Sequence, residues 1–271
     1  YLTAFNSDGF TLGNDQSHVN ANSDTYVSWN WKAGGSASSN SDGSITSSVS
    51  ANTTAGFSIV SYTGTGSAAT VGHGLGAVPK FMFIKNLSAA ESWRIYHQSL
   101  GNATSMKLNT SDASFSDSGA FNSTTPTSTL FTVGNSDSTN KSGDSIIAYC
   151  FAEKKGFSKF GSYSGNGSAD GTFVYTGFKP AWVMAKNTDA TKSWFMYDNK
   201  RDPFNPTVEK LRADTSATEA TGTDKLIDMY SNGFKIRTDD AEFNASGNEY
   251  IYMCFAENPL VTSTGVPTTA R

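Results

Sequence analysis

Three histidines, two cysteines and scattered carboxylates are the residues of this 271-residue chain that could support acid–base, nucleophilic or metal chemistry. The histidines are His18, His73 and His97, and the cysteines are Cys150 and Cys254. Their spacing matches no metal-ligand motif, and the sequence contains no Gly-x-Ser-x-Gly, His-Glu-x-x-His or Gly-x-x-x-x-Gly-Lys-Ser/Thr pattern. We therefore expect no enzymatic activity, no cofactor and no metal site, and two buried free thiols rather than a disulfide.

Aromatic side chains are the better candidates for a binding site. The four candidates form two similar Trp-x-x-Tyr pairs, at Trp93, Tyr96, Trp194 and Tyr197. An exposed aromatic ring can stack on the C–H face of a sugar, so these pairs could bind a carbohydrate beside nearby Asn and Asp residues. Because large apolar residues alternate with other types in both stretches, packing in a core is the alternative.

These paired motifs belong to an internal repeat. Tyr62 and Tyr163 lie 101 residues apart, as do Trp93 and Trp194. A constant separation between rare residue types indicates a duplicated module. We therefore expect the following organisation: residues 1–33 as the C-terminal part of an incomplete module, 34–44 as a flexible linker, 45–154 as module 1, 155–261 as module 2 and 262–271 as a tail.

The module is predicted to be all-β. Short apolar runs recur between clusters of Gly, Pro, Asn, Asp and Ser, which is typical of a β-sandwich or jelly roll. In the last strand of each copy, large side chains occupy alternate positions, and we expect these to face the core. They are Val27, Trp29 and Trp31, then Ile147, Tyr149 and Phe151, then Ile251, Met253 and Phe255.

The incomplete first copy suggests an assembly contact. Val27, Trp29 and Trp31 would form an apolar strand face whose own sheet is incomplete within this sequence. We expect the next module, upstream residues or another chain to cover it, in the last case by adding a strand to a sheet edge. The sequence starts at Tyr1 rather than Met, which suggests a processed product or part of a longer protein.

Charge and hydropathy exclude two classes of partner. The net charge is -4, with no long run of Lys or Arg, so we expect no nucleic-acid binding. No apolar stretch approaches the roughly 20 residues that span a bilayer, so we expect no membrane insertion.

Several motifs resemble those of a known group of proteins. These are the segments that begin at His73 (HGLGAVPKFMFIKN), Gly161 (GSYSGNG), Tyr175 (YTGFKPA) and Tyr252 (YMCFAENP). They resemble a repeated module in virion proteins of tailed bacteriophages from marine and aquatic environments, where it often follows a concanavalin-like lectin domain. The resemblance covers nearly the whole chain. It implies a tail fibre or another component of the virion surface, and no known catalytic residue.

The sequence therefore predicts a non-enzymatic virion structural protein, a tail-fibre or appendage subunit that forms homo-oligomers or fibres and contributes to host attachment. A lectin-like module that binds a host-surface glycan is one alternative. A polysaccharide hydrolase of the tailspike type is another, and it would need two carboxylates facing each other across a groove, roughly 5–10 Å apart.

Overall fold

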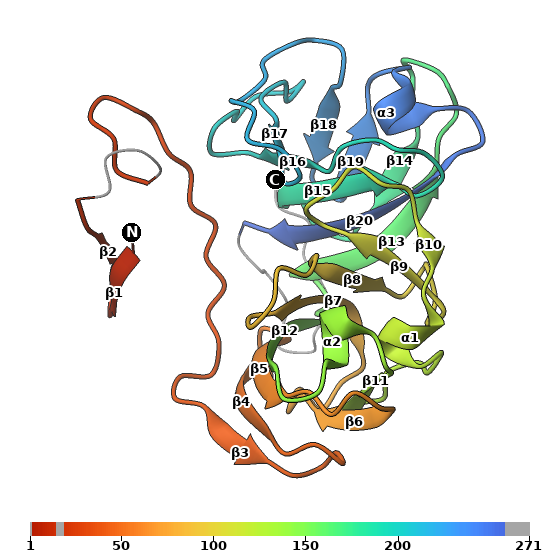
Figure 1. Cartoon of the computed structure of the whole chain (residues 1–271). Coiled ribbons are helices and arrows are strands. Elements are labelled where there is room, and N and C mark those ends of the chain that lie inside the picture. The colour runs from red at the N-terminus through yellow and green to blue at the C-terminus, as the bar shows by residue number, and fades with distance from the viewer. Residues whose placement is uncertain (1, 15–18, 258–271) are drawn as a thin grey trace. The chain divides into compact units, whose positions relative to one another are not determined.

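The chain is all-β, as its sequence predicts. The computed structural model describes residues 2–14 and 19–257, which contain twenty strands and three single-turn helices (Figure 1). These residues fall into two compact units, Tyr1–Lys32 and Ala33–Arg271.

The first unit contains one hairpin. Strands β1 (Leu2–Asn6) and β2 (Gly9–Leu12) pair antiparallel, with Asn6 opposite Gly9 across a two-residue turn. The strand that we expected at Val27–Trp31 is not formed, although Val27, Trp29 and Trp31 are half-buried while the residues between them are exposed. The alternation in the sequence is therefore present without a strand.

The second unit begins with a β-sandwich, the first sandwich. Its larger sheet has the strand order β10-β9-β8-β7-β12-β5-β4-β3 and its smaller sheet is β11-β6. The strands of the larger sheet are β3 (Ser38–Asn40), β4 (Ser47–Asn52), β5 (Phe57–Thr63), β7 (Pro79–Asn86), β8 (Arg94–His97), β9 (Thr104–Lys107), β10 (Phe115–Ser116) and β12 (Ser145–Ala152). The smaller sheet contains β6 (Ala69–Gly72) and β11 (Leu130–Val133), and the helices are α1 (Ser118–Phe121) and α2 (Asp137–Asn140).

The second sandwich follows directly. Its larger sheet has the order β13-β20-β15-β16-β17 and its smaller sheet the order β14-β19-β18. The larger sheet contains β13 (Ser158–Ser164), β15 (Pro180–Asn187), β16 (Phe195–Asp198), β17 (Leu211–Arg212) and β20 (Glu249–Ala256). The smaller sheet contains β14 (Phe173–Tyr175), β18 (Ile227–Tyr230) and β19 (Gly233–Ile236), and the helix is α3 (Ala241–Asn244).

The same pairings recur in both sandwiches. The order β5-β12-β7-β8-β9 in the first matches β13-β20-β15-β16-β17 in the second. Cys150 of β12 pairs with Met82 of β7, and Cys254 of β20 pairs with Val183 of β15. The two pairs are equivalent, because β7 and β15 are offset by 101 residues and β12 and β20 by 104. Both cysteines are buried and free, and burial raises the pKa of the Cys150 thiol to about 12.

The Asn before each last strand explains one repeated motif. Asn140 accepts a hydrogen bond from the backbone N–H of Thr65, and Asn244 accepts one from Asn166. Both amides thereby hold a glycine-containing loop against the single-turn helix. A Cβ at Gly64 would lie 2.1 Å from the carbonyl oxygen of Lys141, so only glycine permits this close approach.

Each sandwich has its own core, and the last strand contributes to it with the face opposite to the one that we expected. In the first sandwich these residues are Ile146, Ala148, Cys150 and Ala152, and in the second they are Tyr250, Tyr252, Cys254 and Ala256. The expected core face, which includes Tyr149 and Phe151 in the first sandwich, points away from the smaller sheet. Here the smaller sheet covers one face of the last strand and the other sandwich contacts the opposite face, so alternation alone does not reveal which face lies inside the sandwich.

The segment 34–44 is not the flexible linker that its composition suggests. Its residues Ser38–Asn40 form β3, which pairs antiparallel with β4. A Cβ at Gly34 would lie 2.2 Å from the carbonyl oxygen of Ala51, and one at Gly43 would lie 2.4 Å from that of Thr70. The glycines therefore serve close packing against the first sandwich rather than flexibility.

Candidate functional site

The aromatic pairs that the sequence favours do not form a surface site. Trp194 is fully buried, and its indole Nε1 donates a hydrogen bond of 2.9 Å to the carbonyl oxygen of Lys107. Tyr197 is also fully buried, and its hydroxyl donates to the carbonyl oxygen of Lys225. No sugar can stack on either ring.

The matching pair in the first sandwich is divided between core and surface. Tyr96 is buried and meets the ring of Phe121 edge-on at 5.4 Å. Trp93 is half-buried, and its ring stacks on Tyr149 at 6.2 Å. The structure thus corrects the expected site at Tyr96, Trp194 and Tyr197, which are buried in or beside the inner strands β8 and β16, whereas Trp93 remains partly accessible.

The two sandwiches pack against each other through aromatic side chains. The rings of Phe151 in β12 and Phe255 in β20 lie 5.9 Å apart. Phe160 of β13 lies 6.2 Å from Phe151 and 5.9 Å from Phe255, and Phe81 of β7 lies 6.2 Å from Phe160. This junction buries the face that we had assigned to the core, and burial of aromatic area stabilises the contact.

Polar contacts accompany the junction. Gln98 donates a hydrogen bond of 2.6 Å from its side-chain amide to the carbonyl oxygen of Phe160. His97 is fully buried, with Nδ1 accepting from the N–H of Ser99 and Nε2 within 3.2 Å of the carbonyl oxygen of Tyr252. Burial lowers the pKa of His97 to about 4, although the Tyr252 carbonyl favours the charged form. The imidazole is therefore neutral at pH 7, with its proton on Nε2.

His73 and His97 each close a turn. In the second sandwich Asp198 stands at the position of His97, and its Oδ1 accepts from the N–H of Lys200 as His97 accepts from Ser99. His73 likewise accepts from the backbone N–H two residues further on. The carboxylate of Asp198 thus makes the same backbone hydrogen bond in the second sandwich as the imidazole of His97 makes in the first. This equivalence supports a structural role for His97.

The hairpin of the first unit presents an apolar face to solvent. Phe5 pairs with Phe10 and their exposed fractions are 82% and 37%. The hairpin β18–β19 has the same register, with Met229 opposite Phe234, and there both side chains are buried in the core of the second sandwich. The same local structure is thus covered in the second sandwich and exposed in the first unit.

A second exposed aromatic group lies on the smaller sheet of the second sandwich. Tyr175 of β14 and Tyr230 of β18 both pair with Gly233 of β19, so they flank a residue without a side chain. Phe173 lies two residues before Tyr175 on the same face, and its ring lies 6.2 Å from that of Tyr230. The exposed fractions of Phe173, Tyr175 and Tyr230 are 43%, 66% and 39%. We call these three rings around Gly233 the outer aromatic face.

Charged residues form a row beside these rings. Lys235 lies opposite Phe173 and binds Asp170 at 2.6 Å, while Arg237 lies 3.4 Å from Asp228. The hydrogen bond from Lys235 lowers the pKa of Asp170. Tyr230 donates a hydrogen bond of 2.8 Å to Asp228, which raises the pKa of the phenol. The row thus connects directly to the outer aromatic face.

A shallow depression of about 410 Å³ adjoins this row. It is lined by Ala169, Asn205, Pro206, Leu226, Asp228 and Arg237. The side chain of Asn205 is fixed by two hydrogen bonds to the backbone of Met229, as donor to its carbonyl oxygen and acceptor from its N–H. Aromatic rings, paired charges and a depression therefore meet on one surface of the second sandwich.

Comparison with known proteins places the chain in a family. The model of a family described as a domain of unknown function, DUF7483, matches residues 1–259. The chain belongs to this family. No curated protein and no solved structure matches it.

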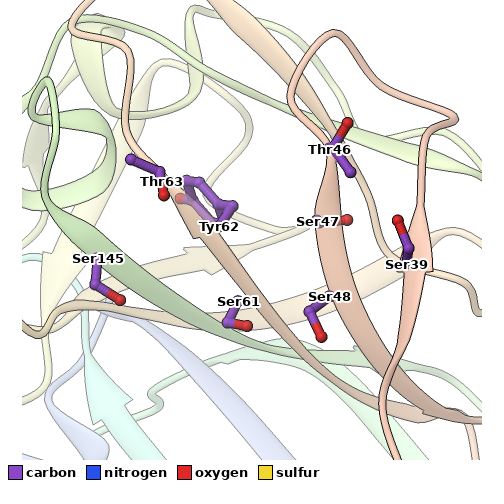
Figure 2. Close-up of a pocket in the computed structure, with 8 residues that line it drawn as sticks. All are labelled: Ser39, Thr46, Ser47, Ser48, Ser61, Tyr62, Thr63 and Ser145. Atoms are coloured by element: carbon purple, nitrogen blue, oxygen red, sulfur yellow. The ribbon is translucent and has the colours of Figure 1, made fainter.

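This DUF7483 chain has a further depression, of about 380 Å³, on the larger sheet of the first sandwich (Figure 2). Ser39 of β3 lies opposite Ser48 of β4, which in turn lies opposite Ser61 of β5, so three serines form a row across adjacent strands. The other lining residues are Thr46, Ser47, Tyr62, Thr63 and Ser145. The lining of this depression is rich in hydroxyl groups and contains no carboxylate. Asp228 is the single carboxylate that lines the depression on the second sandwich. Neither holds the carboxylate pair that glycoside hydrolysis needs.

The remaining titratable groups form ion pairs, and Lys225 has the most partners, since its Nζ pairs with Asp224 and lies 3.4 Å from carboxylate oxygens of Asp240 and Glu242. Among residues 2–14 and 19–257, no cluster of three His, Cys, Asp or Glu side chains has metal-binding geometry, and His18 lies outside this part. Glu153 and Glu257, which follow the two last strands, pair with Lys159 and Lys200. In the part of the chain that the structure describes, no helix has the length and apolar content needed to cross a bilayer.

The sequence could have pointed to the outer aromatic face. Phe173 and Tyr175 alternate with Val174, which predicts a strand with large residues on both faces. Pairing with β11 and β19 shows that Thr70 and Gly72 occupy the corresponding positions in the first sandwich. Aromatic residues present in only one copy are the signal that marks this surface.

Proposed function

We propose that this chain is a non-enzymatic structural protein of a bacteriophage virion, a tail-fibre or appendage subunit at the particle surface that contributes to host attachment. Its motifs resemble those of tailed-phage virion proteins. The polar residues that could support catalysis close turns or form ion pairs, whereas the aromatic packing faces recur in both sandwiches.

The exposed hairpin of the first unit is the observation that carries the assembly part of the proposal. Phe5 and Phe10 hold the positions of Met229 and Phe234, which the second sandwich buries beneath its larger sheet. A soluble protein rarely leaves such a pair of aromatic rings uncovered. In the assembled subunit we expect another β-sheet to cover this face.

The packing within the second unit supports a stiff appendage. The two sandwiches share the aromatic junction around Phe151 and Phe255, and backbone hydrogen bonds cross between them, such as Lys192 N–H to the carbonyl oxygen of Ser111 at 2.8 Å. A junction that is both apolar and hydrogen-bonded restricts hinge motion between domains. Stiffness suits a subunit that transmits or displays a contact at a distance.

Immunogold electron microscopy tests the location. Antibodies raised against the second unit should label the outside of purified particles of the phage that encodes the chain, at the tail or at surface appendages. Particles stripped by washing at high salt and probed with the same antibodies serve as the control for adsorbed protein. Detection only in the soluble fraction of infected cells, with particles unlabelled, would overturn the proposal.

A further inference from the structure

We propose that the outer aromatic face is a carbohydrate-binding site that takes a chain of uncharged hexose rings. Host attachment is the part of the proposed function that this site would serve. Binding is measured on the isolated chain, so it stands or fails independently of any location on a virion.

The shape of the face suits a flat ligand. Gly233 has no side chain, and a Cβ there would lie 3.0 Å from Cζ of Phe173, so the Phe173 ring leans over the glycine. Tyr175 and Tyr230 stand on either side of the same residue. The partly negative face of an aromatic ring attracts the partly positive C–H groups of a sugar, which gather on one side of the hexose ring. Three rings around a bare backbone position therefore form a platform for pyranose rings.

The neighbouring row supplies hydrogen bonds without net charge. Asp170 and Asp228 are balanced by Lys235 and Arg237 through the ion pairs described above. Sugar hydroxyls both donate and accept, so they can bind the carboxylates and the cations. Since the four charges sum to zero, the surface does not favour an anionic or a cationic glycan. The depression beside Asp228 and Arg237 offers space for a second sugar unit.

The first sandwich shows what happens when the equivalent surface is covered. There Thr70 exchanges two hydrogen bonds with Ser44, and the side chain of Asn40 occupies the space above Gly72. The chain segment before β4 therefore closes this surface. In the described part of the chain, the larger sheet of the second sandwich has no counterpart of β3 and β4, so no such segment covers Phe173 and Tyr175 and the surface remains open to a ligand.

Affinity electrophoresis tests the inference. The full chain is run in native gels that contain dextran, laminarin, galactomannan or pullulan, and its retardation relative to gels without polysaccharide gives a dissociation constant. We expect retardation by at least one of these neutral polymers. The variant Tyr175→Ala should weaken binding about tenfold, the factor that corresponds to about 1.4 kcal/mol. Truncation of an anchoring aromatic residue commonly has an effect of this size.

The control variant is Leu87→Ala, which removes another exposed apolar side chain from the first sandwich and should leave retardation unchanged. Tyr175 is mostly exposed, so its truncation should leave folding intact, which circular dichroism checks. A second variant, Tyr230→Phe, keeps the ring and removes only the hydrogen bond to Asp228. It should retain most of the binding.

Three results would overturn the inference. The first is that none of the four polysaccharides retards the chain. The second is that Tyr175→Ala is retarded as strongly as the unmodified chain. The third is that light scattering detects concentration-dependent self-association that Tyr175→Ala abolishes. That result would assign the face to a second molecule of this chain instead.

Discussion

Phe151 and Phe255 hold equivalent positions in the last strands of the two sandwiches, and their rings meet 5.9 Å apart at the junction between them. Each follows a buried cysteine, Cys150 or Cys254, that packs into the core of its own sandwich. One strand thus contributes to two interiors, with the cysteine facing the core of its own sandwich and the phenylalanine facing the neighbouring sandwich. The duplicated strand encodes both the module and its contact with the next one.

Truncation of these two rings should destabilise the junction, and the two losses should not be additive. Phe151→Ala or Phe255→Ala should lower the free energy of unfolding by about 3–5 kcal/mol, since each removes a large buried ring. Because the rings touch, the double variant should lose less than the sum, with a coupling of about 0.5–1.5 kcal/mol. Urea denaturation gives the free energy of unfolding of the two single variants and the double variant. Phe204→Ala, at an exposed ring, is the control, and strictly additive losses would show that the contact contributes nothing.

Acid should destabilise the chain through His97. Its pKa is lowered from 6.5 to about 4 in the folded state, so between these values the unfolded chain binds a proton that the folded chain does not. The free energy of unfolding should therefore fall as the pH drops from about 6.5 to about 4, by about 3 kcal/mol from this residue. Chemical denaturation across this pH range measures the slope.

The variant His97→Asn tests the assignment of that slope. It keeps a side-chain acceptor for the N–H of Ser99 but does not titrate, so the slope between pH 6.5 and pH 4 should be shallower than in the unmodified chain. The residual slope comes from groups present in both proteins, such as His73, whose pKa burial lowers, and Asp224, whose pKa the hydrogen bond from Lys225 lowers. An unchanged slope in His97→Asn would contradict the prediction.

Two glycines at equivalent hairpin positions should respond differently to the same substitution. Gly233→Ala places a Cβ 2.1 Å from the carbonyl oxygen of Val174, whereas a Cβ at Gly9 meets no atom within 4 Å. We expect Gly233→Ala to cost about 1–3 kcal/mol of stability and Gly9→Ala to have almost no effect. Thermal unfolding compares them. Equal effects would show that the crowding around Gly233 relaxes freely.

The exposed hairpin predicts association. Replacement of Phe5 by Asp should reduce the mass of the particles that the purified chain forms, because a charge on the apolar face opposes its burial. Light scattering after size-exclusion chromatography measures the mass. The control is Thr3→Asp, a charge on the same hairpin strand without loss of an aromatic ring. If Phe5→Asp assembles like the unmodified chain, the hairpin face does not mediate association.

Much of the secondary structure could be predicted from sequence. Alternation and turn residues predict the last strands of the two copies, which the structure forms at Ser145–Ala152 and Glu249–Ala256. The Gly/Ser composition of segment 34–44 predicts a flexible linker, and this prediction is wrong because a nearby surface holds the chain. Gly34 and Gly43 have such a surface, and it is formed by residues that follow them in sequence.

The candidate site depended more on tertiary structure. Trp194 and Tyr197 have the composition of a sugar-binding pair, but neighbouring strands bury them. Phe173 and Tyr175, in contrast, lie on a sheet face that nothing in the described part of the second unit covers fully. Exposure is a property of the assembled sheets, and no local pattern contains it.

The sequence by itself determined the all-β class, the internal similarity and the residues that share each strand face, because a period of two follows from backbone geometry. Only the tertiary structure decided what covers each face. Ile146 and Ile147 are adjacent and chemically identical, yet one packs into the core and the other lies on the outer side of the same sheet. The choice between them depends on which neighbouring sheet each side meets, and that contact forms between residues far apart in the chain.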